Sequence, residues 1–273
     1  MFESIKRVLI VDKKDVTIKR VFSAIFRRIN SFPQQLLFYW PFGFYGKNRK
    51  KLKSYKDKYK GKRCFIICNG PSLKDINFDL LKDEYTFGMN RIYLMKEQNG
   101  FVPTFLGCVD IKCQLEQFGD DLDKLDMPCF FNFKARKLFS KKDNQCYIEG
   151  SFSPRFQKDC SKLMGNGKSV TYYVIQLAYY MGFKEVYVIG KDHSYNTTEK
   201  AGAGIFATGN ESNHFIKGYY KPGMVWDAPD YKTEEYNYEL AREAFERDGR
   251  LIANATIGGQ LEVFERVDFY SLF

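Results

Sequence analysis

The stretch that decides the fold is CFIICNGPSLKDINFDLL, residues 64–81. Apolar residues run up to Cys68, and Asn69-Gly70-Pro71-Ser72 follows them directly. A short apolar run that ends at Gly and Pro is typical of a buried strand, and the residues after it predict a helix or turn. In this interpretation Gly70 lets the backbone approach a ligand, Pro71 fixes the turn and Ser72 caps the next helix.

The same alternation of strand and helix continues along the chain. Two long helices are expected at residues 169–183 and 233–249, each closed by a glycine. The strands are expected at residues 63–70, 85–90, 101–110, 127–133, 184–192 and 250–256. Residues 134–165 are polar and irregular, and residues 193–231 form a long stretch without periodicity, which predicts a lid-like loop. The pattern predicts an α/β fold with a mostly parallel sheet and helices on both faces.

Polar residues mark the ends of five of these strands. Because ligands bind beyond the carboxyl ends of parallel strands, we expect these ends to form one binding rim. They are Asn69-Gly70, Asn90, Asp110, Gly190-Lys191-Asp192 and Asn254-Ala255-Thr256.

The charge is concentrated at the N-terminus. Residues 1–63 hold 18 Lys/Arg and 4 Asp/Glu, whereas the rest of the chain holds 25 and 29. The apolar residues Val16, Ile18, Val21, Phe22, Ile25, Phe26 and Ile29 share one helical face, and aromatic residues and a Lys/Arg cluster follow them. We therefore expect residues 1–60 to contact an anionic membrane surface. A helix packed on the 61–273 catalytic domain is the alternative, and no nucleic-acid motif is present.

Other features of the sequence point to a cytoplasmic protein. No apolar run has the roughly 18 residues of a membrane-spanning helix, and the first residues lack the apolar core of a signal peptide. The seven cysteines are scattered and include no CxxC motif, which favours reduced thiols without structural zinc. We expect a protein peripheral to the inner face of the membrane. Self-association into a homo-oligomer stays open.

Four blocks, in order and spacing, resemble the bacterial sialyltransferases of glycosyltransferase family 42. They are CNGPSLKDINFDLL, GMNRIY, SVTYYVIQLAYYMGFKEVYVIGKDHSY and NESNHFIKGY, which begin at residues 68, 88, 169 and 210. The ending NATIGGQLEVFERV is more similar to the related DUF115 proteins, which include motility-accessory-factor flagellin glycosyltransferases and archaeal pterin pyrophosphokinases. The resemblance covers roughly residues 60–265.

The resemblance implies a Rossmann-like GT-A variant fold and an inverting, metal-independent transfer. The co-substrate would be a CMP-activated acidic sugar (sialic acid, a related nonulosonate or Kdo), and the acceptor a cell-surface glycan. Carried over by position, Asn69, Gly70, Pro71, Ser72, Asn90 and Ser169 bind the nucleotide. His214 is the general base. Ser194, with Tyr195 beside it, stands where the family has its phosphate-stabilising tyrosine.

The residues themselves add further candidates. Histidine suits a general base, since its pKa is near neutral, and His193 and His214 are the only two in the chain. Lys168 can offer a cation to an anion at the start of the helix that opens at Ser169. Asp110 and Asp192 are expected to cap turns or bind ribose hydroxyls rather than a metal. The rim residues Gly190, Asn254 and Thr256 complete the nucleotide-binding prediction.

Two other functions stay open. A DUF115-type pyrophosphokinase would need ATP, Mg²⁺ and paired carboxylates near the phosphates. A non-catalytic scaffold that binds a nucleotide would need none of these. Under the glycosyltransferase reading we expect no cofactor and no metal.

Overall fold

The computed structural model describes residues 18–152 and 155–273. The chain divides into two compact units, Met1–Lys47 and Asn48–Phe273. The second unit begins before residue 61 because helix α3 (Gly43–Ser54) supplies side chains to its core: Leu52 is buried, and the Asn48 amide donates to the Tyr147 carbonyl at 2.8 Å. The sheet therefore depends on part of the basic segment.

The first unit contains helix α2 (Ile18–Tyr39), which continues through Pro33. Large apolar side chains of this unit are exposed at intervals of three or four residues from Phe22 to Trp40, and Phe42 follows: Phe22, Phe26, Ile29, Phe32, Leu36, Trp40 and Phe42. Of the predicted apolar face, Val16 and the side chains of Ile18, Val21 and Ile25 lie outside the described residues. In the described part of the chain, no helix is long and apolar enough to cross a membrane.

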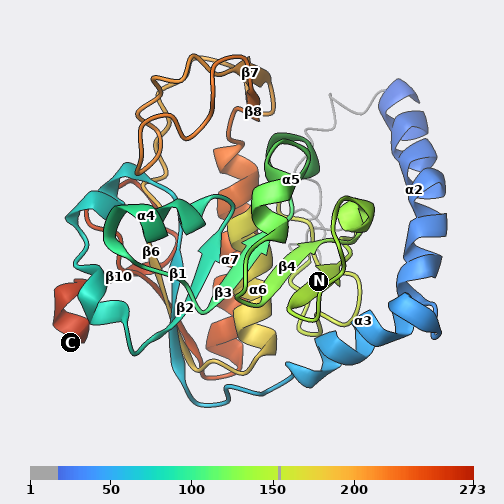
Figure 1. Ribbon diagram of the computed structural model, residues 1–273, viewed down its shortest axis with the longest axis horizontal. Coiled ribbons are helices and arrows are strands. Elements are labelled where there is room, and N and C mark those ends of the chain that lie inside the picture. Colours follow the sequence, from blue (N-terminus) through green and yellow to red (C-terminus); the bar gives the residue numbers. More distant parts are fainter. Residues whose placement is uncertain (1–17, 153–154) are drawn as a thin grey trace. The chain divides into compact units, whose positions relative to one another are not determined.

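The second unit is built on an eight-stranded sheet in which every neighbouring pair is parallel (Figure 1). Its order is β10-β9-β6-β1-β2-β3-β4-β5. The strands are β1 (Arg63–Ile67), β2 (Tyr85–Met89), β3 (Phe105–Cys108), β4 (Cys129–Asn132), β5 (Gln145–Ile148), β6 (Glu185–Ile189), β9 (Leu251–Asn254) and β10 (Glu265–Arg266). This is the Rossmann-like α/β fold that the alternation predicted.

Both faces of the sheet are covered. Helix α6 (Val170–Tyr180) packs against β1, β2 and β3, and helix α7 (Tyr231–Arg247) packs against α6 and β9. On the opposite face, Phe269 and Phe273 of the C-terminal turn contact the Phe65 ring. Apart from β10, whose two residues are exposed, the strands are almost wholly buried, which explains why most of them read as continuous apolar runs.

Several connections between the strands consist of short turns and helices. After Gly70, where the sequence predicted a helix or a turn, the structure has two 3-10 turns, η2 (Pro71–Asp75) and η3 (Phe78–Leu81), because Ile76 is extended and the Asn77 side chain accepts from the Asp79 N–H. The remaining short helices are η4 (Ile92–Leu94), α4 (Met95–Asn99), η5 (Ile111–Leu115), α5 (Glu116–Asp123), η6 (Phe133–Leu138) and η7 (Tyr270–Leu272). Strand β5 lies in the stretch predicted as irregular, because a four-residue edge strand gives too little pattern to recognise.

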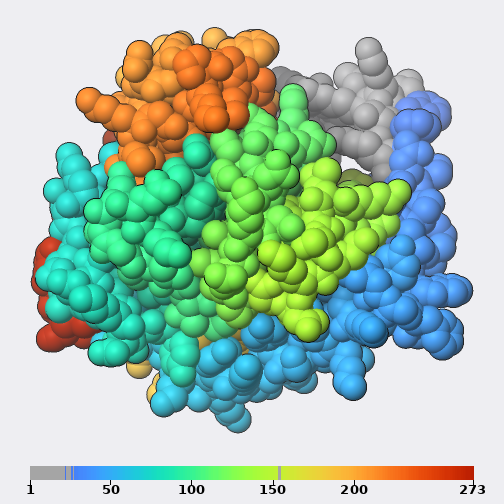
Figure 2. All heavy atoms as spheres, in the orientation of Figure 1, coloured from blue at the N-terminus to red at the C-terminus, as the bar shows by residue number. Residues whose placement is uncertain are grey.

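Residues 193–231 form a lid that carries the antiparallel hairpin β7 (Gly204–Phe206) and β8 (Val225–Asp227). Figure 2 shows the lid, in orange, directly against the green segment around α5. Polar contacts hold it there: Gln114 donates to the Tyr220 hydroxyl at 2.5 Å, and the Arg91 guanidinium donates to the Tyr219 carbonyl. The Phe215 N–H also donates to the Asn69 carbonyl at 2.9 Å, which ties the lid to the end of β1.

Candidate functional site

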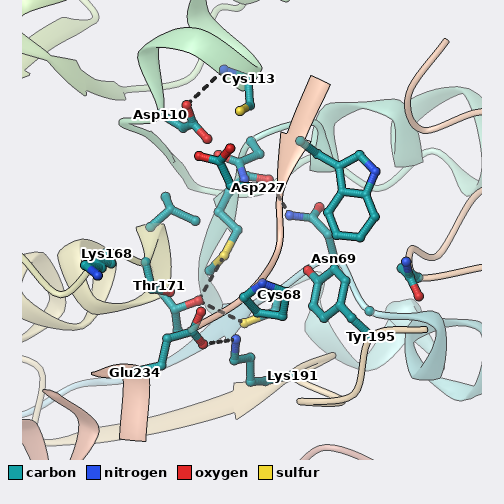
Figure 3. Close-up of a pocket in the computed structure, with 18 of the residues that line it drawn as sticks. Cys68, Asn69, Asp110, Cys113, Lys168, Thr171, Lys191, Tyr195, Asp227 and Glu234 are labelled. Atoms are coloured by element: carbon teal, nitrogen blue, oxygen red, sulfur yellow. Dashed lines mark hydrogen bonds and ion pairs between the residues drawn. The ribbon is translucent and has the colours of Figure 1, made fainter. Parts of the chain in front are cut away.

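The chain runs from β1 outward to β5 and then returns to β6 on the other side of β1, so the sheet has its topological switch point between β1 and β6. Ligands bind at such points because neighbouring loops leave in opposite directions. A cavity of about 560 Å³ lies there, between the carboxyl ends of the strands, the start of α6 and the lid (Figure 3).

Most of the residues predicted from the sequence line this single cavity. The three catalytic candidates, His214, Ser194 and Tyr195, are among them. So are eight of the nucleotide-binding candidates: Asn69, Gly70, Asn90, Asp110, Lys168, Ser169, Gly190 and Asp192. The other four, Pro71, Ser72, Asn254 and Thr256, do not line it.

The turn after β1 is tied to the loop after β6. The Ser72 hydroxyl donates to Asp192 Oδ2 at 2.8 Å, and its N–H donates to Oδ1 at 3.2 Å, so Ser72 caps no helix. A Cβ on Gly70 would clash with the Asp192 carboxylate and lie 2.6 Å from the Gly190 carbonyl oxygen. Gly70 is therefore needed for the close approach of two loops, and it also lines the cavity.

Asn254 and Thr256 also have structural partners. The Asn254 amide donates to the Leu261 carbonyl at 2.8 Å, and the Thr256 hydroxyl accepts from the Lys191 N–H at 3.1 Å. Both side chains are buried. They hold the loop after β9 and the loop after β6 in place, and neither residue lines the cavity in which the nucleotide is expected to bind.

The backbone around the cavity is strained at three places. Asn90, Lys168 and His193 all have φ between 51° and 54°, a left-handed conformation that costs free energy in residues other than glycine. Asn69 is buried at the same rim: its amide donates to the Met89 carbonyl at 3.1 Å, while its Oδ1 has no hydrogen-bond partner among the described residues. Such features gather where a ligand completes the structure.

His214 lies in the lid, where its ring stacks on Tyr219 with centroids 3.8 Å apart and meets Tyr195 and Tyr220 edge-on. Burial lowers the pKa of His214 to about 4; the Glu211 carboxylate raises the pKa slightly and the Arg91 guanidinium lowers it. Its Nδ1 has no partner among the described residues. At neutral pH the side chain is therefore an uncharged imidazole that can accept a proton.

Tyr195 stands between the strand ends and the lid. Its ring stacks on Trp226 with centroids 5.8 Å apart, and its N–H donates to the Tyr231 hydroxyl at 2.7 Å. Burial raises the pKa of Tyr195 to about 12, so the phenol keeps its proton and can donate to an anion. Ser194, beside it, is exposed.

A buried ion pair in the cavity wall went unrecognised in the sequence. Lys191 Nζ lies 2.7 Å from Glu234 Oε2 (Figure 3). Next to it, His193 Nε2 forms a 3.0 Å hydrogen bond with Oε1 of the more exposed Glu235. Glu234 is in the first turn of α7, some forty residues beyond Lys191. Lys191 could be found from the sequence, because it lies in the predicted rim segment Gly190–Asp192. Glu234 could not, because it belongs to a helix whose periodicity indicates only packing.

Acidic groups outnumber cations in the cavity wall. Among the described residues, two lysines and five carboxylates line it: Lys168, Lys191, Asp110, Asp192, Asp227, Asp230 and Glu234. Asp110 at the end of β3 and Asp227 at the end of β8 face each other in Figure 3. Burial raises the pKa of Asp110, hydrogen bonds from Cys113 lower it, and the charge of Asp227 raises it further.

No group of three or more His, Cys, Asp or Glu side chains that could hold a metal occurs in the parts of the chain that the structure describes. Two carboxylates suffice for Mg²⁺ when substrate phosphates complete its coordination. The seven cysteines are all free and buried, and burial raises the pKa of the Cys68 thiol, beside the cavity, to about 11. The thiols are therefore protonated and unreactive at neutral pH.

The comparisons with known proteins agree with this arrangement in part. The family model of the 6-hydroxymethylpterin diphosphokinase MptE-like proteins matches residues 44–198, more than half of the chain. The chain therefore belongs to this family. No curated protein matches it significantly.

Two solved structures are similar to the chain. One is the MAf glycosyltransferase from Magnetospirillum magneticum AMB-1, with a TM-score of 0.49 and 15% sequence identity over 92% of this chain. This chain spans 42% of the length of that protein. The other is a mammalian sialyltransferase in complex with Gal-beta-1-3GalNAc-ortho-nitrophenol, with a TM-score of 0.39 and 11% identity over 90% of this chain and 89% of that one.

Proposed function

We propose that the chain is an inverting glycosyltransferase that moves an acidic sugar from a cytidine monophosphate carrier to a glycan hydroxyl. The observation that carries the proposal is the place of His214: an uncharged imidazole, in the lid, that lines the same cavity as the nucleotide-binding candidates Asn69, Asn90 and Ser169. A base and a nucleotide rim in one enclosed cavity are what this transfer requires.

The chemistry follows from the groups present. The acceptor oxygen attacks the anomeric carbon, the bond from that carbon to the phosphate oxygen breaks, and CMP leaves with the bonding electrons. His214 takes the proton of the acceptor hydroxyl. Its low pKa in the ligand-free chain makes it a weak base, but a phosphate bound nearby raises the pKa because it favours the imidazolium. The Tyr195 phenol is placed to donate to the leaving phosphate.

The test is CMP release from CMP-sialic acid, a related CMP-nonulosonate and CMP-Kdo, with and without a chelator. We expect release that the chelator leaves intact and that His214→Ala abolishes. Release that persists in His214→Ala at the wild-type rate would contradict the assignment of the base. Binding of CMP with no turnover of any of these sugars would leave a nucleotide-binding scaffold.

A second candidate function has a specific observation in its favour. The family name describes a diphosphokinase, a reaction that needs a divalent cation beside the phosphates, and Asp110 and Asp227 bring two carboxylates together in the cavity. Their hard oxygen atoms fit Mg²⁺, which would offset the negative charge of a nucleotide triphosphate. The same assay with ATP and 6-hydroxymethylpterin distinguishes the two: ATP consumption that chelator and Asp227→Asn both abolish would favour the diphosphokinase.

We further propose that helix α2 binds an anionic membrane surface. Phe22, Phe26, Ile29 and Leu36 are more than half exposed on this helix, and a cluster of lysines and arginines follows at residues 47–53. Apolar side chains enter the interface while cations meet lipid phosphates. In flotation with phosphatidylserine vesicles, the full chain with Phe26→Ser and Ile29→Ser should stay unbound, whereas Gln35→Ser should float like wild type. Equal flotation of all three would exclude this helix as the contact.

A further inference from the structure

Lys191 is the buried cation of the cavity wall. Its residue is 9% exposed, and it lines the cavity at the end of β6. Lys168, which the sequence suggested as the cation, has a side chain that is 64% exposed and lies 3.0 Å from the Asp230 carboxylate. Both lysines are paired with a carboxylate, but water screens the charge of an exposed lysine, so the buried Lys191 is the stronger candidate for binding an anion.

The ammonium group of Lys191 has donors to spare. It carries three N–H groups. Among the described residues, one of these groups is used, in a hydrogen bond to Glu234 Oε2 at 2.7 Å. Burial alone would lower the pKa of Lys191, but the Glu234 carboxylate together with Tyr238, Tyr195 and Cys68 outweighs burial and holds the pKa well above its usual value. Lys191 is therefore charged at every working pH and can donate to a second acceptor from the cavity.

Glu234 keeps other partners if Lys191 turns toward a ligand. The Tyr238 hydroxyl donates to Glu234 Oε2 at 3.3 Å, and His193 Nδ1 lies 3.9 Å from the same oxygen. Tyr238 also lies 3.2 Å from the Ser169 hydroxyl at the start of α6. Lys191 is thus connected by hydrogen bonds to the helix N-terminus that lines the same cavity, where Ser169 provides no side-chain cap to the free N–H groups.

The charge of the wall makes such a cation necessary. With five carboxylates around the cavity, a phosphate is repelled unless a cation of the protein meets it directly. Helix α6, with 11 residues, adds its N-terminal N–H groups, and these favour an anion. Lys191 and the start of α6 form the part of the cavity that offers hydrogen-bond donors and positive charge.

We propose that Lys191 binds the phosphate of the nucleotide, against the N-terminus of α6, and stabilises the charge that develops on it as the sugar leaves. The proposal rests on the proposed function in its choice of nucleotide and of the leaving sugar; the phosphate contact itself does not, since either candidate reaction brings a phosphate into this cavity. Glu234 is a positioning residue: it holds the Lys191 ammonium at the cavity floor in the absence of ligand.

The experiment measures how much the phosphate adds to binding. Affinities for CMP and cytidine, for ATP and adenosine, and for inorganic pyrophosphate are determined by calorimetry on the full chain. The variants are Lys191→Met, Lys191→Met with Glu234→Gln, and Glu234→Gln alone. The double variant removes both buried charges together, since Lys191→Met alone leaves an uncompensated carboxylate that can prevent folding. Thermal melts show which variants fold.

We expect the ratio of CMP to cytidine affinity to fall about 10- to 100-fold in both variants that lack Lys191, because one charge-assisted hydrogen bond to the phosphate is lost. Cytidine affinity should stay at the wild-type value. Glu234→Gln should keep or raise the ratio, because it removes a carboxylate beside the anion. Lys158→Met, which breaks the 2.7 Å ion pair with Asp248 outside the cavity, is the matched control and should leave the ratio unchanged.

The outcomes separate the two proposals. A ratio that Lys191→Met with Glu234→Gln leaves at the wild-type value would overturn the role of Lys191 while the CMP-sugar reaction stands. If the variants leave the ratio of CMP to cytidine affinity unchanged but lower the ratio of ATP to adenosine affinity or the affinity for pyrophosphate, the role of Lys191 is supported and the proposal of a CMP-sugar donor is overturned. If the ratio of CMP to cytidine affinity falls equally in Glu234→Gln, the Lys191–Glu234 ion pair has a structural role and the phosphate contact is overturned. If the wild-type protein shows no phosphate-dependent binding, both the phosphate contact and the CMP-sugar reaction are contradicted.

Discussion

The imidazole of His214 lies flat on the phenol ring of Tyr219, with the ring planes 2° from parallel and the centroids 3.8 Å apart. Tyr219 is held in turn by Arg91, whose N–H donates to the phenol oxygen at 3.2 Å. Arg91 lies two residues after the end of β2, so the sheet fixes the position of the lid histidine through one tyrosine. The orientation of the base depends on this contact as much as on the lid backbone.

Tyr219→Leu should raise the pKa of His214 from about 4 toward 6.5, because the ring that removes the imidazole from water is lost. NMR titration measures this directly, since the chain has two histidines and His193→Gln assigns the other. Tyr270→Leu, at an exposed tyrosine of the C-terminal turn, is the control and should leave the titration unchanged. An unaltered pKa in Tyr219→Leu would mean that other groups bury His214.

The kcat/KM of CMP release should not fall around pH 6.5, where a solvent-exposed histidine would become protonated. Because kcat/KM reports the free protein, its acid limb should lie near pH 4, and kcat/KM should be flat from about pH 5.5 to 8. The limb in kcat should lie at higher pH, because the bound phosphate raises the pKa of the base. A kcat/KM limb at pH 6.5 would assign the proton transfer to a solvated group instead.

Glu149→Gln should stabilise the protein at alkaline more than at acid pH. Glu149 is buried after β5, and burial raises its pKa to about 7, although Lys134, 3.7 Å away, and the Gly150 N–H lower it. The native chain therefore holds a proton that the unfolded chain loses from pH 4.5 upward, so this carboxyl lowers stability progressively between pH 4.5 and 7, by up to about 3 kcal/mol.

Chemical unfolding at pH 5 and pH 8 checks this prediction. The difference in unfolding free energy between Glu149→Gln and wild type should become more favourable to the variant at pH 8. For Glu97→Gln, at an exposed position on α4, the difference in unfolding free energy from wild type should be the same at pH 5 and pH 8. The same difference for Glu149→Gln at pH 5 and pH 8 would show that the carboxyl ionises normally.

Nucleotide binding should alter the fluorescence of Trp226. This residue is 5% exposed, lines the cavity and stacks on Tyr195, and Trp40 is the only other tryptophan. In Trp40→Phe, titration with CMP should shift or quench the emission, while Trp226→Phe should give no response. Binding by calorimetry without any change in Trp40→Phe would place the nucleotide away from the lid.

Much of the fold was predictable from the sequence because its strands are buried on both faces. A run such as residues 64–68 has no polar side to place in water, so it reads as a strand without knowledge of its neighbours. Strand β5 escaped because an edge strand of four residues lacks that signal, and the segment after Gly70 became two turns because Ile76 adopts an extended conformation. The rim was predictable for the same reason as the strands, since parallel strands must all end on one side.

The sequence by itself therefore determined the parallel sheet and the rim, because local composition and periodicity carry them. Only the tertiary structure decided which rim residues face the cavity. Ser72, Asn254 and Thr256 form hydrogen bonds within and between loops, while Lys191, Glu234 and Asp227 line the cavity. The physical reason is that hydrogen bonds and ion pairs between residues 40 to 120 positions apart, such as Lys191–Glu234 and Ser72–Asp192, form only when the sheet brings their strands together.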